Sequence, residues 1–166
     1  MAAIGETGLP YYRRQADPGI SLEPYIGLLE EFIIRAKLWQ KPIVLHAVYE
    51  DTPIVIDLLE KHSVTKAHFH WFKGNPSLIE RMIANRYFVS ITPDLLYKDR
   101  TRRLVAQYPL SLLMAETDGP WPFEGPFKNQ KTHPRMIHSI IRTIAEIKKT
   151  DIEKTYQTIY KNTFEF

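Results

Sequence analysis

The sequence predicts an α/β fold with a parallel sheet. Short apolar segments alternate with longer amphipathic segments along the chain, which is typical of repeated βαβ units. The apolar segments recur at 24, 21 and 24 positions, counted through Val44, His68, Val89 and Leu113. Polar residues stand near the carboxyl ends of these segments. The spacing suits either a barrel or a doubly wound sheet.

Five apolar segments bounded by Pro, Gly, Asn or Asp are predicted as strands. They are residues 2–9, 42–48, 66–72, 87–92 and 110–117. The segments between them carry helical patterns, and the clearest is the apolar stripe with a period of 3.6 residues over 21–39. Further helices are expected over 77–85, 97–107, 133–149 and from about 150 to 161.

Three sequence signals mark expected helix starts. Thr52 is a candidate N-cap, with Pro53 at the first helical position, and Asn75 followed by Pro76 repeats this arrangement. Thr150 with Glu153 forms a candidate capping box for the last helix. There is no internal repeat, low-complexity tract or linker, so residues 1–166 are expected to form a single domain.

Composition narrows the class of protein. With 166 residues, 44% hydrophobic and 25% charged, the chain has ordinary globular composition. It has no cysteine, which excludes disulfides, a cysteine nucleophile and thiolate zinc sites. It has no long apolar stretch and no signal-peptide pattern at its start, so a cytoplasmic protein without membrane contact is expected. The net charge of +3 is compatible with an anionic substrate.

Polar residues near the ends of the predicted strands are the candidate site. They are Glu6, His46, His68, His70, Glu116 and Asp118. Parallel strands are normally apolar throughout because helices cover both faces, so these exceptions are informative. An alternation of two places Ile4, Glu6 and Gly8 on one face, and likewise the pairs His68–His70 and Glu116–Asp118, the latter with Leu112 and Met114.

Imidazoles and carboxylates gathered from several strands suit a divalent metal ion such as zinc or manganese. A bound ion would offset the cost of burying carboxylates and would acidify water. The alternative interpretation is that each histidine is a hydrogen-bonded core residue. The matching positions of the whole set favour the metal site.

The motifs at these positions resemble the TatD family of metal-dependent hydrolases, which are TIM-barrel proteins of the amidohydrolase group. They are GETGLPYY (5–12), PIVLHA (42–47), HWFKGNP (70–76), YFVSITPD (87–94), MAETDGP (114–120) and NTFEF (162–166). They follow the family's order over essentially the whole chain. The resemblance therefore implies a (β/α)8-type barrel and hydrolysis of phosphodiester bonds, with DNA as a candidate substrate.

The resemblance also implies roles for individual residues. Glu6 matches a carboxylate that bridges two metal ions, and His46 and His70 match the histidines of one metal site. Asp118 matches the aspartate that binds the other ion and helps to activate water, so Glu6 and Asp118 are the expected catalytic residues. His68 and Glu116 are expected to pack behind the ligands. One or two ions of zinc, manganese or magnesium are the expected cofactors.

Two features depart from the family pattern. Many members have Asp after the GL pair, where this chain has Pro10. The family barrel also opens with a strand bearing an H-x-H pair, whereas the present chain corresponds to the family from its third strand onward, and its H-x-H is His68–His70. We therefore expect a truncated barrel, with a second ion bound weakly and with homo-oligomers formed through open barrel edges.

Aromatic and basic residues are expected on loops around the mouth of the site. Tyr11, Arg13 and His133 are the candidate substrate contacts, through stacking on bases and binding of phosphates. Ordinary loop packing is the alternative. Three functions stay open from the sequence: a phosphoester hydrolase, a hydrolase of amides or lactones, and a catalytically impaired or non-catalytic assembly module.

Overall fold

The computed structural model describes residues 2–166, which form two compact units, one up to Phe88 and the other Val89–Phe166. Both contain parallel strands joined through helices, which confirms the predicted α/β class. No helix within residues 2–166 is long and apolar enough to cross a membrane.

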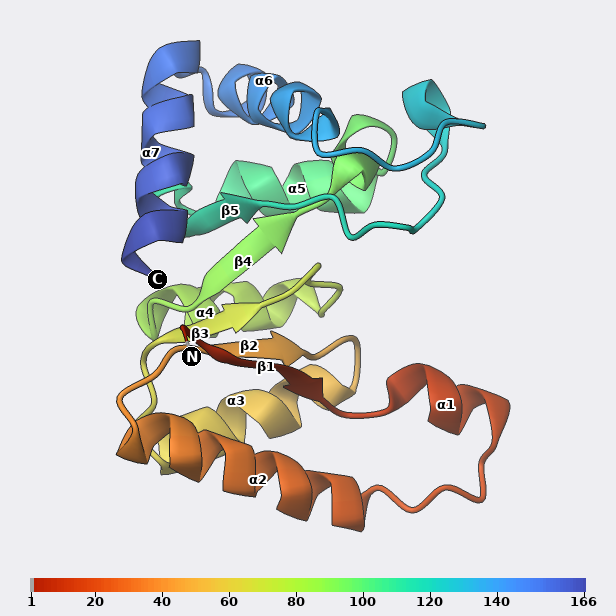
Figure 1. The fold of residues 1–166 in the computed structure, drawn as a ribbon, viewed down its shortest axis with the longest axis vertical. Coiled ribbons are helices and arrows are strands. Elements are labelled where there is room, and N and C mark those ends of the chain that lie inside the picture. Colours follow the sequence, from red (N-terminus) through yellow and green to blue (C-terminus); the bar gives the residue numbers. More distant parts are fainter. Residues whose placement is uncertain (1) are drawn as a thin grey trace. The chain divides into compact units, whose positions relative to one another are not determined.

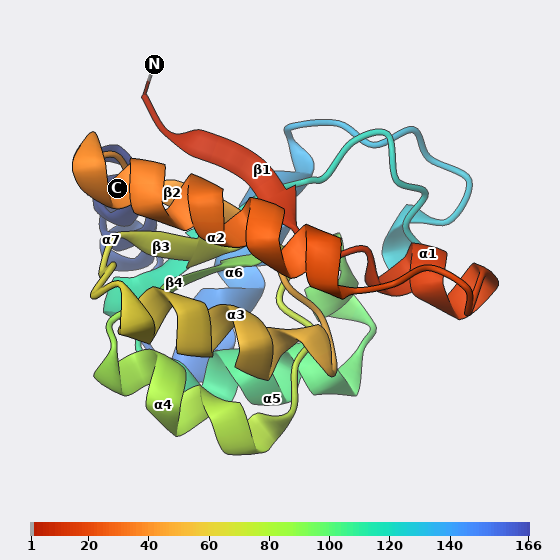
Figure 2. The ribbon, with the colours of Figure 1, turned by 90° about the horizontal axis from the view of Figure 1, so that it is seen from below.

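The first unit has three neighbouring parallel strands, β1, β2 and β3 (Figure 1). In chain order its elements are β1 (Ile4–Gly8), α1 (Tyr11–Ala16), α2 (Glu23–Leu38), β2 (Ile43–His46), α3 (Asp51–Lys61), β3 (Ala67–Phe69), the 3₁₀ turn η1 (Pro76–Leu78) and α4 (Ile79–Ala84). Figure 2 shows α2 and α3 side by side along the strands. The predicted apolar stripe of α2 buries Leu29, Ile33 and Ala36.

An irregularity in β1 changes which of its residues share a face. Ile4 pairs with Ile43 and Gly8 pairs with His46, so β1 uses one residue more than β2 over this stretch. Ile43 and His46 point to opposite faces, and so therefore do Ile4 and Gly8. The prediction that Ile4, Glu6 and Gly8 share a face is thus wrong for Ile4. The extra residue leaves Ile4 in the core and Glu6 exposed.

The second unit contains β4 (Phe88–Ile91), which begins at the last residue of the first unit, and β5 (Leu113–Ala115) parallel to it. Its other elements are η2 (Pro93–Leu96), α5 (Asp99–Gln107), η3 (Leu110–Leu112), η4 (Gly125–Phe127), α6 (Met136–Lys148) and α7 (Ile152–Glu165). Asn162 of α7 is 6% exposed, and its amide donates to the carbonyls of Leu110 (2.8 Å) and Leu113 (2.7 Å). These bonds fix the last helix to the start of β5.

Two of the predicted helix starts are wrong and one is confirmed. Helix α3 begins at Asp51, and the Thr52 hydroxyl inside it donates to the Ala47 carbonyl at 3.3 Å. Asp151, not Thr150, caps α7, because its carboxylate accepts from the Lys154 amide. Asn75 caps η1 as expected by accepting from Ser77.

Strand alternation also ends earlier than the sequence predicts. Leu112 lies in a 3₁₀ turn before β5, and Asp118 after β5 has a φ of 42°, so no common face joins Leu112, Met114, Glu116 and Asp118. Strand β3 ends at Phe69, and Trp71 has a φ of 38°. Tyr11 and Arg13 lie on a short helix rather than on a loop.

Candidate metal centre

Three side chains of the first unit converge at the carboxyl ends of its strands. Glu6 Oε1 lies 3.2 Å from His46 Nδ1, and Glu6 Oε2 lies 3.9 Å from His70 Nε2. One ligand atom from each of the three residues lies within 4.8 Å of the other two. The structure thus brings together three of the four predicted metal ligands.

Two glycines allow β1 to place Glu6 beside His46. A Cβ on Gly8 would lie 2.0 Å from the His46 carbonyl oxygen, and one on Gly5 would lie 2.6 Å from that of Val44. Gly5 also has a φ of 138°, a conformation that other residues rarely adopt. Glycine at both positions therefore lets the backbones of β1 and β2 approach closely on either side of Glu6.

His46 and His70 are fixed by the strands that precede them. His46 is the last residue of β2. His70 directly follows β3, and its amide donates to the Leu45 carbonyl at 3.0 Å, which continues the ladder one residue past the strand. Trp71, the next residue, has a positive φ of 38°, which ends the regular strand. The two imidazole rings lie 6.2 Å apart, with Glu6 near both.

The electrostatics favour an ionised Glu6. The hydrogen bond with His46 lowers the pKa of the Glu6 carboxyl, partial burial raises it, and the positive charges that His70, His46 and His68 can carry lower it further, with a net lowering. The exposed fractions of the side chains are 43% for Glu6, 31% for His46 and 11% for His70. The group is therefore open to solvent on the side of Glu6.

This donor set fits a divalent cation. An ionised carboxylate and two imidazoles are ligands that zinc and related ions prefer. Metal–ligand distances for zinc are about 2.0–2.2 Å, so two ligand atoms of one ion lie at most about 4.4 Å apart. The ligand atoms here lie within 4.8 Å of one another, so small side-chain movements bring all three to one ion. Three protein ligands with a solvent-open side are typical of a catalytic site.

A hollow of about 320 Å³ adjoins the candidate ligands. Glu6 and His46 line it together with residues of α1 and the segment before it. The Tyr12 ring lies 6.0 Å from the His46 ring, and Lys73 donates to the Tyr12 hydroxyl at 3.2 Å. The Lys73 ammonium also lies 3.5 Å from the Trp71 ring centre, so aromatic faces hold this cation in place.

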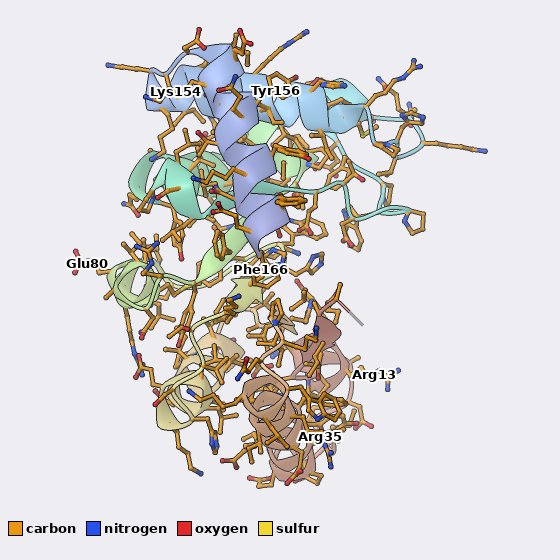
Figure 3. The ribbon with its side chains drawn as sticks, turned by 60° about the vertical axis from the view of Figure 1, so that its left-hand side comes forward. Arg13, Arg35, Glu80, Lys154, Tyr156 and Phe166 are labelled. Atoms are coloured by element: carbon orange, nitrogen blue, oxygen red, sulfur yellow. The ribbon has the colours of Figure 1, made fainter. Side chains whose placement is uncertain are left out.

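The remaining predicted site residues are not among the three converging side chains. His68 is buried in β3 of the first unit. Glu116 and Asp118 follow β5 in the second unit and are partly exposed, and His133 is exposed before α6. Tyr11 lines the hollow beside Glu6, and so does Arg13, which points outward from α1 (Figure 3). The roles of these residues remain predictions.

Two contributors to this region were not predicted from the sequence. The first is the pair of glycines around Glu6, although isolated glycines in a strand pattern signal a bulge or a close backbone approach. The second is Asp51, an acidic residue that follows the His46 strand and pairs with Arg14. A single acidic residue at a helix start gives no sequence signal for a partner 37 positions away.

Comparison with known proteins finds relatives over the whole chain. The family model described as "TatD related DNase" matches residues 1–166. A Haemophilus influenzae protein named an uncharacterized metal-dependent hydrolase is 38% identical over the whole chain, which covers 65% of that protein. Human deoxyribonuclease TATDN3 is 31% identical over 98% of the chain and 58% of its own length.

A solved structure shows the same fold. The crystal structure of YjjV, a TatD homologue from Escherichia coli, matches 99% of the chain with a TM-score of 0.85 and 24% identity. The match covers 62% of YjjV, so the chain spans a little under two thirds of the proteins it resembles. The TatD structures are of the TIM-barrel type, which confirms the predicted fold class. The chain belongs to the family of TatD-related DNases.

Proposed function

We propose that the chain is a metal-dependent hydrolase of phosphoester bonds. The observation that carries the proposal is the convergence of Glu6, His46 and His70 within 4.8 Å at the strand ends. Family membership and relatives named metal-dependent hydrolase or deoxyribonuclease support it. The proposal extends to DNA as a substrate, as the name of the human relative suggests.

The chain's own residues would share the work as follows. His46 and His70 would hold the ion through their ring nitrogens, and Glu6 would supply negative charge. Its lowered pKa keeps Glu6 ionised near neutral pH without help from the metal. A divalent ion bound there supplies Lewis-acid chemistry that polarises an ester oxygen and acidifies water. Asp118 is proposed as the residue that orients the attacking water.

The hollow beside the ligands is the proposed substrate-binding surface. Tyr12 offers an aromatic face next to His46, and Arg13 adds an exposed positive charge on the same short helix. Phosphate groups bind such cations, and bases stack on such rings. An anionic substrate with an aromatic group would therefore use both.

The test combines metal content with cleavage. The purified chain is stripped of metal, reloaded with zinc, manganese or magnesium, and assayed on bis(p-nitrophenyl) phosphate, on DNA, and on an amide and a lactone. We expect metal-dependent cleavage of the phosphodiesters alone. Glu6→Gln and His46→Gln should abolish it, whereas His138→Gln, a helix-surface histidine of the second unit, should not. Metal-independent rates, or equal losses in all three variants, would contradict the proposal.

A further inference from the structure

Helix α1 (Tyr11–Ala16) forms part of the hollow beside Glu6 and His46, yet none of its residues is buried. A six-residue helix is not stable by itself, because nucleation outweighs the few hydrogen bonds it makes. Burial of apolar side chains does little to hold it either. The position of α1 must therefore depend on specific contacts with the rest of the first unit.

The contact that reaches deepest is the ion pair between Arg14 and Asp51. Arg14 Nη2 donates to Asp51 Oδ1, and the side chains are 23% and 1% exposed. Asp51 is the first residue of α3, where the helix N-terminus favours a negative charge. Loss of either partner would leave the other charge uncompensated in or near the interior. The pair thus joins α1 to the start of α3.

The pairing is incomplete on both sides. Arg14 Nε and Asp51 Oδ2 are buried and, among residues 2–166, have no hydrogen-bond partner. Arginine–carboxylate pairs are frequently bidentate, with two parallel bonds, whereas this pair uses one nitrogen and one oxygen. A partly satisfied buried pair contributes little to stability, and holding a particular geometry is one documented use of such pairs.

The geometry that this pair holds reaches a candidate metal ligand. Tyr11 packs on Tyr49 with ring centres 4.9 Å apart, and the neighbouring Tyr12 lies 6.0 Å from the His46 ring. Lys73 supports Tyr12 from its hydroxyl end. A shift of α1 would therefore move the Tyr12 ring away from His46 and reshape the hollow.

We infer that Arg14 and Asp51 are positioning residues, which hold α1 so that Tyr12 stays beside His46 and the substrate hollow keeps its shape. The inference rests on the proposed function in one respect, because it takes the hollow to be the substrate's. Neither residue needs to touch the metal or the reacting atoms for this role.

A spin label tests the positioning without any activity. The chain has no cysteine, so a cysteine introduced at the exposed Gln15 of α1 is labelled alone. We expect Arg14→Gln and Asp51→Asn to increase label mobility at position 15, but not at position 31 of α2 in a matched Glu31→Cys chain. Arg14→Lys should keep the label immobile, because only one nitrogen of Arg14 is used. Circular dichroism confirms that each variant is folded.

Kinetics test the consequence for the substrate. With a nucleotide ester such as thymidine 5′-(p-nitrophenyl phosphate), Arg14→Gln should raise KM about tenfold with kcat within about threefold, since binding geometry and not chemistry is disturbed. Metal affinity should be unchanged. Arg35→Gln, an exposed arginine of α2 labelled in Figure 3, should leave both constants unchanged.

The outcomes separate the two proposals. An immobile label in Arg14→Gln, increased mobility at both labelled positions, or failure of Arg14→Lys to restore immobility would overturn the positioning role. So would a fall in kcat at constant KM. If the parent chain cleaves no substrate, the proposed function fails, and the label then decides alone whether Arg14 and Asp51 place α1.

Discussion

A polar cluster in the first unit and a buried polar residue in the second unit show opposite arrangements. In the first unit, Glu6, His46 and His70 face one another, and their side chains are 43%, 31% and 11% exposed. In the second unit, Asn162 is 6% exposed and gives both amide hydrogens to backbone carbonyls at the start of β5. The ligand atoms of the first-unit cluster lie within 4.8 Å of one another. In contrast, both amide hydrogens of Asn162 are already used in hydrogen bonds.

The difference shows that the partners of a polar residue indicate whether it serves stability or ligand binding. Buried polar groups that bond backbone atoms satisfy the chain and hold elements together. A carboxylate and imidazoles that converge at a partly exposed site gain little in stability from the convergence, so a ligand is the better explanation. We therefore expect substitutions of Glu6, His46 or His70 to change metal binding, and substitutions of Asn162 to change stability.

The largest expected effect is loss of metal from the first-unit cluster. His46→Ala or Glu6→Gln should weaken zinc or manganese binding at least about 100-fold, since loss of supporting residues around a ligand already costs about 10–100-fold. The midpoint of thermal unfolding of the metal-free chain should hardly change. Isothermal titration calorimetry measures the affinity, with His138→Gln as the control. If both variants kept the metal affinity of the parent chain, the distinction between this cluster and Asn162 would not hold.

The next largest effect is expected on stability and not on metal binding. Asn162→Ala removes two hydrogen bonds from a buried side chain, so it should lower the free energy of unfolding by about 2–3 kcal/mol. Metal affinity should stay the same. Urea unfolding measures the change, and Gln157→Ala, at an exposed position of the same helix, is the matched control. A loss of metal binding as large as that of His46→Ala would contradict the comparison.

A glycine pair sharpens the comparison within the first unit. Gly8→Ala should destabilise the chain by about 1–3 kcal/mol and weaken metal binding, because its Cβ would lie 2.0 Å from the His46 carbonyl oxygen. Gly27→Ala in α2 meets nothing within 4 Å and should stabilise by about 0.5–1 kcal/mol. Thermal unfolding and metal titration of both variants check this. Equal behaviour of the two glycines would mean that the close approach of β1 and β2 is not needed.

Much of the fold followed from the sequence because periodicity reflects burial. Apolar runs located every strand, and the stripe over residues 21–39 located α2 with its buried Leu29, Ile33 and Ala36. Helix starts were less predictable, because Thr52 and Thr150 lie beside acidic residues that occupy the first turn or the cap instead. Helix α1 gave no signal, because none of its residues is buried and it has no apolar stripe.

The sequence predicted which residues form the candidate site. It did not predict how their side chains are arranged. Polar interruptions identified Glu6, His46 and His70, which the structure brings together. The alternation of two failed at Ile4 and at Asp118, because a bulge and a left-handed turn reset the side-chain direction. The Arg14–Asp51 pair depends on tertiary contact alone, which no local pattern encodes.

The smallest expected effect concerns a second carboxylate whose pKa is lowered, Glu60. Arg81 donates to both its oxygens, at 2.8 and 2.5 Å, and with Asn85 it holds the pKa of Glu60 below its ordinary 4.5. A carboxyl whose pKa is lower in the folded state stabilises the fold above the unfolded pKa, and this contribution is lost as pH falls through the folded value.

Glu60→Gln should therefore lower stability at pH 7 by about 1 kcal/mol or less, because the pair is exposed and screened by salt. The difference from the parent should begin to shrink as the pH falls below 4.5, and it should vanish once the pH is below the lowered pKa of the folded state. Metal affinity should not change, in contrast to Glu6→Gln, although both carboxyls have lowered pKa values. Thermal unfolding from pH 3 to 7 measures the effect, with the exposed Glu80→Gln as control (Figure 3). If the loss of stability were the same at every pH, Glu60 would contribute through packing and not through its charge. Glu60 and Glu6 would then differ in metal binding alone.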